Sequence, residues 1–200
     1  MADGPRYSVP FRRRREGRTD YKLRLGLVRS GRPRAVVRMS NRYVYVQIIE
    51  SHPHGDIVRA SASSQDLSGL GWKAGTRNLP SAYLTGILAG RRALGEGVKE
   101  AIVDSGLRSS TKGSRLYAAV NGLVDAGLEV PHAEDVLPSK ERLRGGHIAA
   151  FGKLLSSRPG DSYKRLLSAY LRKSLKPEDL AGHFEQVKEQ VQSGKVEARN

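Results

Sequence analysis

The sequence predicts an α/β domain, a layered mixed sheet with packed helices, flanked by a basic extended N-terminal arm and a helical C-terminal extension. Three observations predict this class. Strand-like alternation occurs over 34–63, helical apolar spacing surrounds one further short strand over 80–126, and helical spacing alone continues beyond Pro131 and Pro138. The expected parts of the chain are residues 1–18, 19–130 and 131–200.

The arm shows no apolar periodicity and is interrupted by Pro5, Pro10 and Gly17. We expect it to be extended and to order on its partner. Five arginines fall within seven positions of it, and neighbouring guanidinium groups repel one another unless an anion neutralises them. The run favours nucleic-acid binding, with a solvated arm or a localisation signal as the alternative. These arginines are Arg12, Arg13, Arg14, Arg15 and Arg18.

A short helix is expected after the arm. Thr19 is a good N-cap residue, Asp20 suits the first turn, and the helix should end near Ser30. Lys22 and Arg24 lie mainly away from its apolar side and would continue the basic surface.

Three strands follow, over 34–40, 43–49 and 56–63, with connections short enough for antiparallel hairpins. Basic residues occur along the first hairpin, and they fit either an extended basic surface or an ordinary polar sheet face. They are Arg34, Arg38 and Arg42.

The loop 64–79 contains the run 69–74, which matches the dinucleotide-binding pattern in letters only. No buried parallel strand leads through it into a helix, so cofactor binding is not expected. An aromatic residue among polar and basic ones fits a base contact, and a tryptophan filling the edge of the core fits equally well. The residues concerned are Trp72, Lys73, Arg77 and Asn78.

Two helices are expected over 80–94 and 113–126, with a short buried strand over 101–103 between them. Lys112 and Arg115 lie at the start of the second helix, where cations oppose the helix dipole. Cations in that place hint at an anionic ligand.

Beyond residue 130 the spacing predicts helices over 142–155, 161–174 and 177–193. Charges alternate along the last of these, which indicates an exposed helix. We expect the extension to have a modest core of its own and to pack on a partner.

The composition points to a polyanionic partner. The net charge is +15 and the pI is near 10.4, and +9 of that charge lies in residues 1–60. No apolar run is long enough to span a membrane and no signal-peptide pattern is present, so neither a membrane nor secretion is expected. The chain has no cysteine, which excludes disulfides, thiol nucleophiles and cysteine-ligated metals.

Catalytic chemistry is not expected, and neither is a cofactor, a metal or a small-molecule substrate. His52, His54 and Asp56 form a possible cluster on a turn, but nothing nearby completes a ligand set. A metal-dependent nuclease would need convergent acids, for which Asp104 and Asp125 are the candidates. Capping or ion pairing is the simpler role for both.

Several long segments carry a family resemblance. The run 11–21, the segment 33–38, Gly71–Trp72–Lys73, the segment 78–86 and Arg144–Gly145–Gly146–His147–Ile148–Ala149 are among them. Over about residues 6–152 the chain resembles the 5S-rRNA-binding protein family of the large ribosomal subunit, in its longer archaeal and eukaryotic form.

The resemblance implies a structural protein that binds 5S rRNA and helps to seat it in the central protuberance of the large subunit. It also implies contacts with the large rRNA and neighbouring ribosomal proteins, in the cytoplasmic ribosome. The arm arginines, Lys22 and Arg24 match the family's RNA-binding region. The alternatives are a metal-dependent nuclease acting on RNA and a basic adaptor that binds protein.

Overall fold

The computed structural model describes residues 4–158 and 161–193, and its centre is a four-stranded sheet with the order β3-β2-β1-β4. β1, β2 and β3 are antiparallel neighbours, whereas β4 lies parallel to β1. The α/β class and the antiparallel hairpins predicted from the sequence are confirmed. The strands span Arg34–Met39 (β1), Val44–His52 (β2), Gly55–Ser63 (β3) and Ile102–Asp104 (β4).

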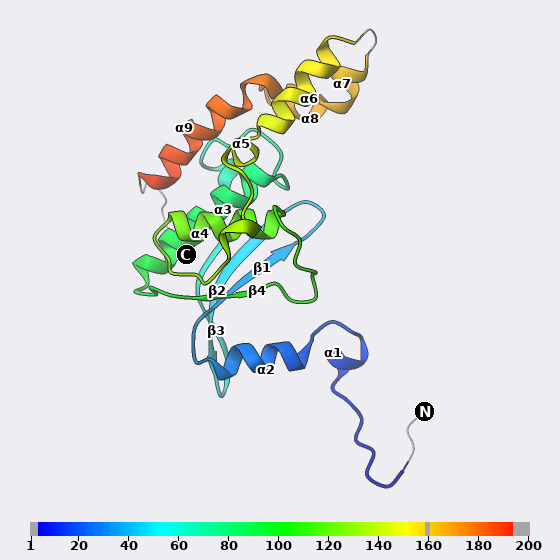
Figure 1. The fold of residues 1–200 in the computed structure, drawn as a ribbon, viewed down its shortest axis with the longest axis vertical. Helices are drawn as coiled ribbons and strands as arrows, with labels where there is room; N and C mark the ends of the chain where they lie inside the picture. Colours follow the sequence, from blue (N-terminus) through cyan, green and yellow to red (C-terminus); the bar gives the residue numbers. More distant parts are fainter. Residues whose placement is uncertain (1–3, 159–160, 194–200) are drawn as a thin grey trace.

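Alternation along β1 directs its side chains to two different layers. Ala35 and Val37 face the core and are fully buried, while Arg34, Val36 and Arg38 lie on the other face. The core face is covered by α3 (Leu79–Gly95) and α4 (Arg115–Asp125), which lie side by side on the sheet (Figure 1). The opposite face approaches α2 (Tyr21–Arg29) across a cavity at the start of β1.

Two glycines allow α3 and α4 to pack closely. A Cβ atom added to Gly86 would lie 2.1 Å from the carbonyl oxygen of Ala119, and one added to Gly122 would lie 2.1 Å from that of Tyr83. Only hydrogen fits at these positions, so the two helix backbones meet directly and seal the core.

The C-terminal extension leaves the body and returns to it. Gly145 has a left-handed backbone (φ 84°) and separates the short α5 from α6, which divides the helix predicted over 142–155. Figure 1 shows α6, α7 and α8 projecting from the body and α9 running back along it. The helices span Lys140–Leu143 (α5), Gly146–Ser156 (α6), Ser162–Leu166 (α7), Ser168–Leu171 (α8) and Leu180–Gln192 (α9).

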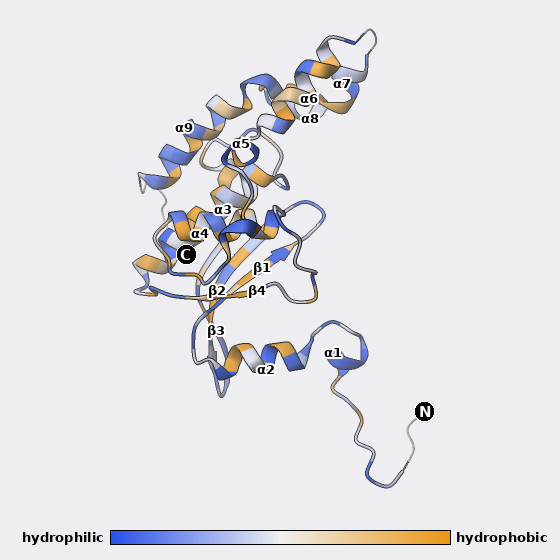
Figure 2. Ribbon diagram, in the orientation of Figure 1, coloured by the Kyte–Doolittle hydropathy of each residue, from blue (hydrophilic) through white to orange (hydrophobic). Residues whose placement is uncertain are grey.

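The prediction of an exposed last helix is wrong in one respect. One face of α9 is buried in the main core, and Figure 2 shows its polar and apolar residues alternating. Because the apolar residues recur at helical spacing, the charges occupy only the outer face. The buried residues are Leu180, Phe184, Val187 and Val191.

The N-terminal segment differs from the prediction in two details. A single helical turn, α1 (Arg12–Arg15), interrupts the extended arm. Asp20, and not Thr19, is the N-cap of α2, and its carboxylate accepts hydrogen bonds from the amides of Lys22 and Leu23 at 2.9 and 3.0 Å. The parts of the predicted arm and extension at 1–3, 159–160 and 194–200 lie outside the described residues.

None of the helices in the described parts of the chain combines the length and the apolar character that a membrane span requires.

Candidate nucleic-acid interface

The arginine run on α1 is exposed along its whole length, and no residue of this helix is buried. Glu16 is its nearby acid and lies 3.7 Å from Arg12 and 3.1 Å from Arg18. Arg13 donates a hydrogen bond from Nε to the hydroxyl of Thr19 at 2.9 Å. One carboxylate therefore partly neutralises a run of five guanidinium groups.

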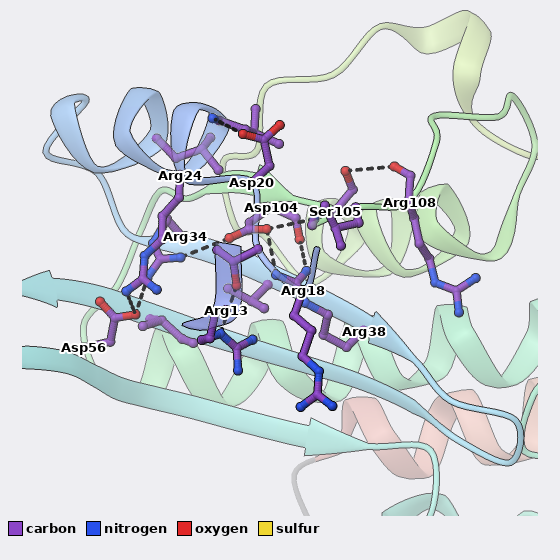
Figure 3. A pocket seen from close by; sticks show the side chains of 17 residues that line it. Arg13, Arg18, Asp20, Arg24, Arg34, Arg38, Asp56, Asp104, Ser105 and Arg108 are labelled. Atoms are coloured by element: carbon purple, nitrogen blue, oxygen red, sulfur yellow. Dashed lines mark hydrogen bonds and ion pairs between the residues drawn. The ribbon is translucent and has the colours of Figure 1, made fainter. Parts of the chain in front are cut away.

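A cavity of about 370 Å³ lies between the arm, α2 and the outer face of the sheet. Figure 3 shows arginines from all three elements around it, with Asp56 and Asp104 among them. Its walls thus combine guanidinium groups with three carboxylates that belong to the fold, those of Asp20, Asp56 and Asp104. The labelled cations are Arg13, Arg18, Arg24, Arg34, Arg38 and Arg108.

The register of β1 and β4 explains how this network forms. Asp104 lies opposite Val36, so its side chain falls between Arg34 and Arg38, which lie two residues to either side of Val36 on the same face. The Asp104 carboxylate accepts hydrogen bonds from Arg34 at 3.0 Å and from Arg38 at 2.8 Å. Arg34 also donates to Asp56 at 2.7 Å.

The pKa of Asp104 reflects this arrangement. Burial alone would raise the pKa, but the hydrogen bond and charge of Arg38, the amide of Gly106 and the hydrogen bond from Arg34 together hold it below its ordinary value. The ionised carboxylate is therefore a structural counter-ion between two strands. The role explains why β4 ends in an acidic residue.

Arg34 must be removed from the candidate RNA contacts. Its side chain is 4% exposed, and the two terminal nitrogens of its guanidinium donate to two carboxylates of the fold. Arg38 is different, because its side chain is 45% exposed while it pairs with Asp104. The alternatives for these residues were an ordinary polar sheet face and an extended basic surface. Arg34 fits the first, whereas Arg38 borders the open surface.

Trp72 must also be removed, for a similar reason. The indole is 2% exposed, stacks on His183 with ring centroids 5.2 Å apart, and donates from Nε1 to the carbonyl of Gly75 at 3.1 Å. Of the two alternatives for this residue, a base contact or a tryptophan that fills the edge of the core, the second is correct. Lys73 next to it is exposed, and its backbone amide donates to Nε2 of His183 at 3.0 Å.

Asn78 is used by the fold as a helix cap. Its side-chain oxygen accepts a hydrogen bond from the amide of Ser81 at 2.9 Å, at the start of α3. Its amide nitrogen lies 3.4 Å from the hydroxyl of Tyr170. A side chain committed to both contacts is a poor candidate for RNA, and we remove it from the candidates.

The remaining cations lie at the end of the sheet near the start of α4. Arg115 donates to the carbonyl of Arg77 at 2.9 Å, and Lys112 pairs with the carboxylate of Asp135. Arg108 joins this group although the sequence did not single it out, because only the topology brings the loop after β4 beside α4. Arg42 lies in the exposed turn after β1.

The acids and histidines do not form a metal site in the part of the chain that the structure describes. Asp125 accepts a hydrogen bond from the hydroxyl of Tyr83 at 2.7 Å, and burial is the main cause that raises the pKa of that hydroxyl. The rings of His52 and His54 lie 5.6 Å apart on the turn between β2 and β3. Asp104 is occupied by arginines, so the acids proposed for a nuclease each have a structural partner.

Comparisons with known proteins agree on one family. Residues 5–99 match the family described as ribosomal large subunit proteins 60S L5 and 50S L18. The chain is 50% identical to large ribosomal subunit protein uL18 of Aeropyrum pernix, over 96% of this chain and 90% of the relative. It is 53% identical to the uL18 of Caldivirga maquilingensis (96% and 93%) and 47% identical to that of Methanothermobacter thermautotrophicus (96% and 98%).

Proposed function

The chain belongs to the uL18 family of large-subunit ribosomal proteins, and from this membership we propose that it binds 5S rRNA and helps to anchor that RNA to the large rRNA in the central protuberance. Its relatives are structural ribosomal proteins and not enzymes. The chain is therefore a constituent of the large ribosomal subunit that takes part in translation by binding, as the sequence predicted.

The exposed arginine run is the observation that supports 5S rRNA binding most directly. Arg14 and Arg15 have no ion-pair partner among residues 4–158 and 161–193, and Glu16 serves both Arg12 and Arg18. A guanidinium group binds phosphate through two parallel hydrogen bonds, and each phosphate that it neutralises releases condensed counter-ions. The arm is thus supplied with charge that the fold does not use.

In the proposed mechanism, arm and body have separate tasks. The arm and α2 neutralise phosphates, while the sheet with α3 and α4 holds the base of the arm in a fixed orientation. The major groove of an RNA helix is too narrow for side chains to read, so preference for 5S rRNA should come from its shape and from unstacked bases. We propose these contact residues: Arg12, Arg13, Arg14, Arg15, Arg18, Lys22, Arg24, Arg38, Arg42, Lys73, Arg77, Lys112 and Arg115.

The test compares the purified chain bound to 5S rRNA and to a tRNA at several salt concentrations. We expect a preference for 5S rRNA that persists as salt rises, because shape complementarity does not depend on counter-ion release. Equal affinity for both RNAs, lost together with rising salt, would contradict the proposal. The variant Arg59→Gln is a matched control, since this arginine pairs with Glu50 on the far hairpin.

A further inference from the structure

Three arginines converge at the end of the sheet where β1 and β4 both finish. Each is held by a backbone carbonyl group and not by a carboxylate. Arg108 donates to the carbonyl of Met39 at 2.8 Å, and Arg77 donates to that of Asn41 at 3.3 Å. Arg115 donates to the carbonyl of Arg77 at 2.9 Å.

The charge of this cluster is not balanced by the protein. Within residues 4–158 and 161–193, none of the three arginines forms an ion pair. Burial, followed by the positive charges of Arg77 and Arg108, lowers the pKa of Arg115 below its ordinary value. An anion that binds between like charges offsets their repulsion, so its binding is favourable.

The start of α4 supplies further donors at the same place. Ser114 is the N-cap residue, but its hydroxyl makes no capping hydrogen bond, and its Oγ is buried without a partner in the described structure. The first amides of a helix have no partner inside the helix and favour negative charge. Arg108, Ser114 and Arg115 line a depression of about 340 Å³ that opens onto this helix end.

We propose that Arg77, Arg108, Arg115 and the N-terminus of α4 form a binding site for one phosphate group of the RNA backbone. The three guanidinium groups present planar pairs of N–H donors, which match phosphate oxygens. Ser114 Oγ and the first amides of α4 add further donors, and no acidic residue of the described structure lines the depression. This site lies apart from the arm, and only its assignment to RNA rests on the proposed function.

A site of this kind fixes position more than it adds affinity. The arm can slide along many phosphates, whereas a pocket formed by the end of β1, the loop after β4 and the start of α4 receives one phosphate in one place. Phosphate contacts of this type set the register of a protein on its nucleic acid. Lys112 and Arg115 oppose the dipole of the empty helix end. When a phosphate is bound there, the same cations face a negative charge, and their position becomes favourable.

The first measurement uses inorganic phosphate and the full chain, followed by amide chemical shifts in NMR spectra. We expect saturable shifts at Arg115 and Leu116 that are absent in the double variant Arg108→Gln/Arg115→Gln and retained in Arg59→Gln. Shifts spread evenly over exposed cations, or none at α4, would overturn the proposal.

A second variant separates binding from folding. Ser114→Asp places a carboxylate where the phosphate would lie and caps the helix, so we expect a raised melting temperature together with loss of the phosphate-dependent shifts. A purely structural role for the cluster would leave those shifts in place. Because this variant should fold at least as well as the parent, lost binding cannot be attributed to unfolding.

A third measurement, with 5S rRNA in place of inorganic phosphate, tests whether the bound phosphate belongs to RNA. With 5S rRNA, Ser114→Asp should reduce the slope of log affinity against log salt by about 0.7–0.9, the value for one phosphate contact on a single strand or duplex. If α4 amides respond to phosphate but the slope is unchanged, the RNA assignment is overturned. If 5S rRNA and tRNA bind equally while the pocket still binds phosphate, the proposed function fails and the anion site stands.

Discussion

The arginines on either side of α2 meet opposite conditions. In the arm, the four arginines of α1 and Arg18 have one nearby carboxylate, and the side chain of Arg12 is 75% exposed. On β1, the guanidinium of Arg34 is 4% exposed and contacts both Asp56 and Asp104. The same residue type is therefore an exposed and largely unneutralised cation in one segment and part of the sheet's internal structure in the other.

This difference shows that charge counts do not locate an interface by themselves. Residues 1–60 carry a net charge of +9, and both groups of arginines contribute to it. Folding brings acids from β3 and β4 to Arg34 of β1, whereas no acid of the described fold forms an ion pair with Arg14 or Arg15. The charge left over after folding is the charge available to RNA.

The largest expected effect tests the internal group. Asp104→Asn should destabilise the chain by about 3 kcal/mol or more, because Arg34 and Arg38 would lose a shared counter-ion in a buried site. Urea unfolding measures the change. Glu50→Gln is the control, since its pair with Arg59 is exposed and should contribute less than about 1 kcal/mol. Equal losses in the two variants would erase the distinction between buried and exposed arginines.

The next effect tests the arm. Replacing Arg14 and Arg15 by Gln should leave the free energy of unfolding within about 0.5 kcal/mol, because both residues are exposed and neither forms an ion pair in the described fold. The same change should reduce the salt slope of 5S rRNA binding by about 1.4–1.8, which corresponds to two lost phosphate contacts. A large loss of stability with an unchanged slope would mean that the arm serves the fold.

A pH titration tests the internal group without altering its shape. The folded state holds the pKa of Asp104 below its ordinary value of 3.8, so its contribution to stability is fully present above that value. The contribution is lost as the pH falls from 3.8 through the lower folded-state pKa. Acid unfolding of Asp104→Asn should therefore be less steep in this range than that of the parent chain. Parallel curves would show that Asp104 is not a counter-ion.

Local periodicity was enough to predict most of the fold. The hairpins over 34–63 and the helices α3 and α4 follow from alternation and from helical spacing, which are properties of neighbouring residues. The partners of the charged and aromatic side chains were not predictable in this way. Arg34 and Asp104 are 70 residues apart, and His183 lies 110 residues from Lys73, whose backbone amide donates to its ring.

The candidate site shows the same division. The exposed arm residues could be proposed because clustered arginines are visible in the sequence, but Trp72 and Asn78 looked like contacts until their partners in the fold were known. Arg108 was missed because a single arginine in a loop carries no signal. Only the parallel pairing of β4 with β1 reveals that its loop lies beside the start of α4.

The smallest effect concerns Arg24, which belongs to both groups. This arginine shares Asp56 with Arg34 at 2.9 Å, yet its side chain is 41% exposed. Because an exposed ion pair contributes little, Arg24→Gln should cost less than about 1 kcal/mol. Its effect on the salt slope should also be smaller than that of one arm arginine, since Asp56 already neutralises part of its charge.

The background variant Asp56→Asn sharpens this last expectation. It releases Arg24 toward the RNA while Arg34 keeps its bond to Asp104 at 3.0 Å. Arg24→Gln should then reduce the salt slope more in the Asp56→Asn chain than in the parent chain, approaching about 0.7–0.9. Binding and unfolding measured on all four chains form a double-mutant cycle. The same slope change in both backgrounds would show that Asp56 does not restrain Arg24. Arg24 would then belong with the arginines available to RNA and not with those that the fold neutralises.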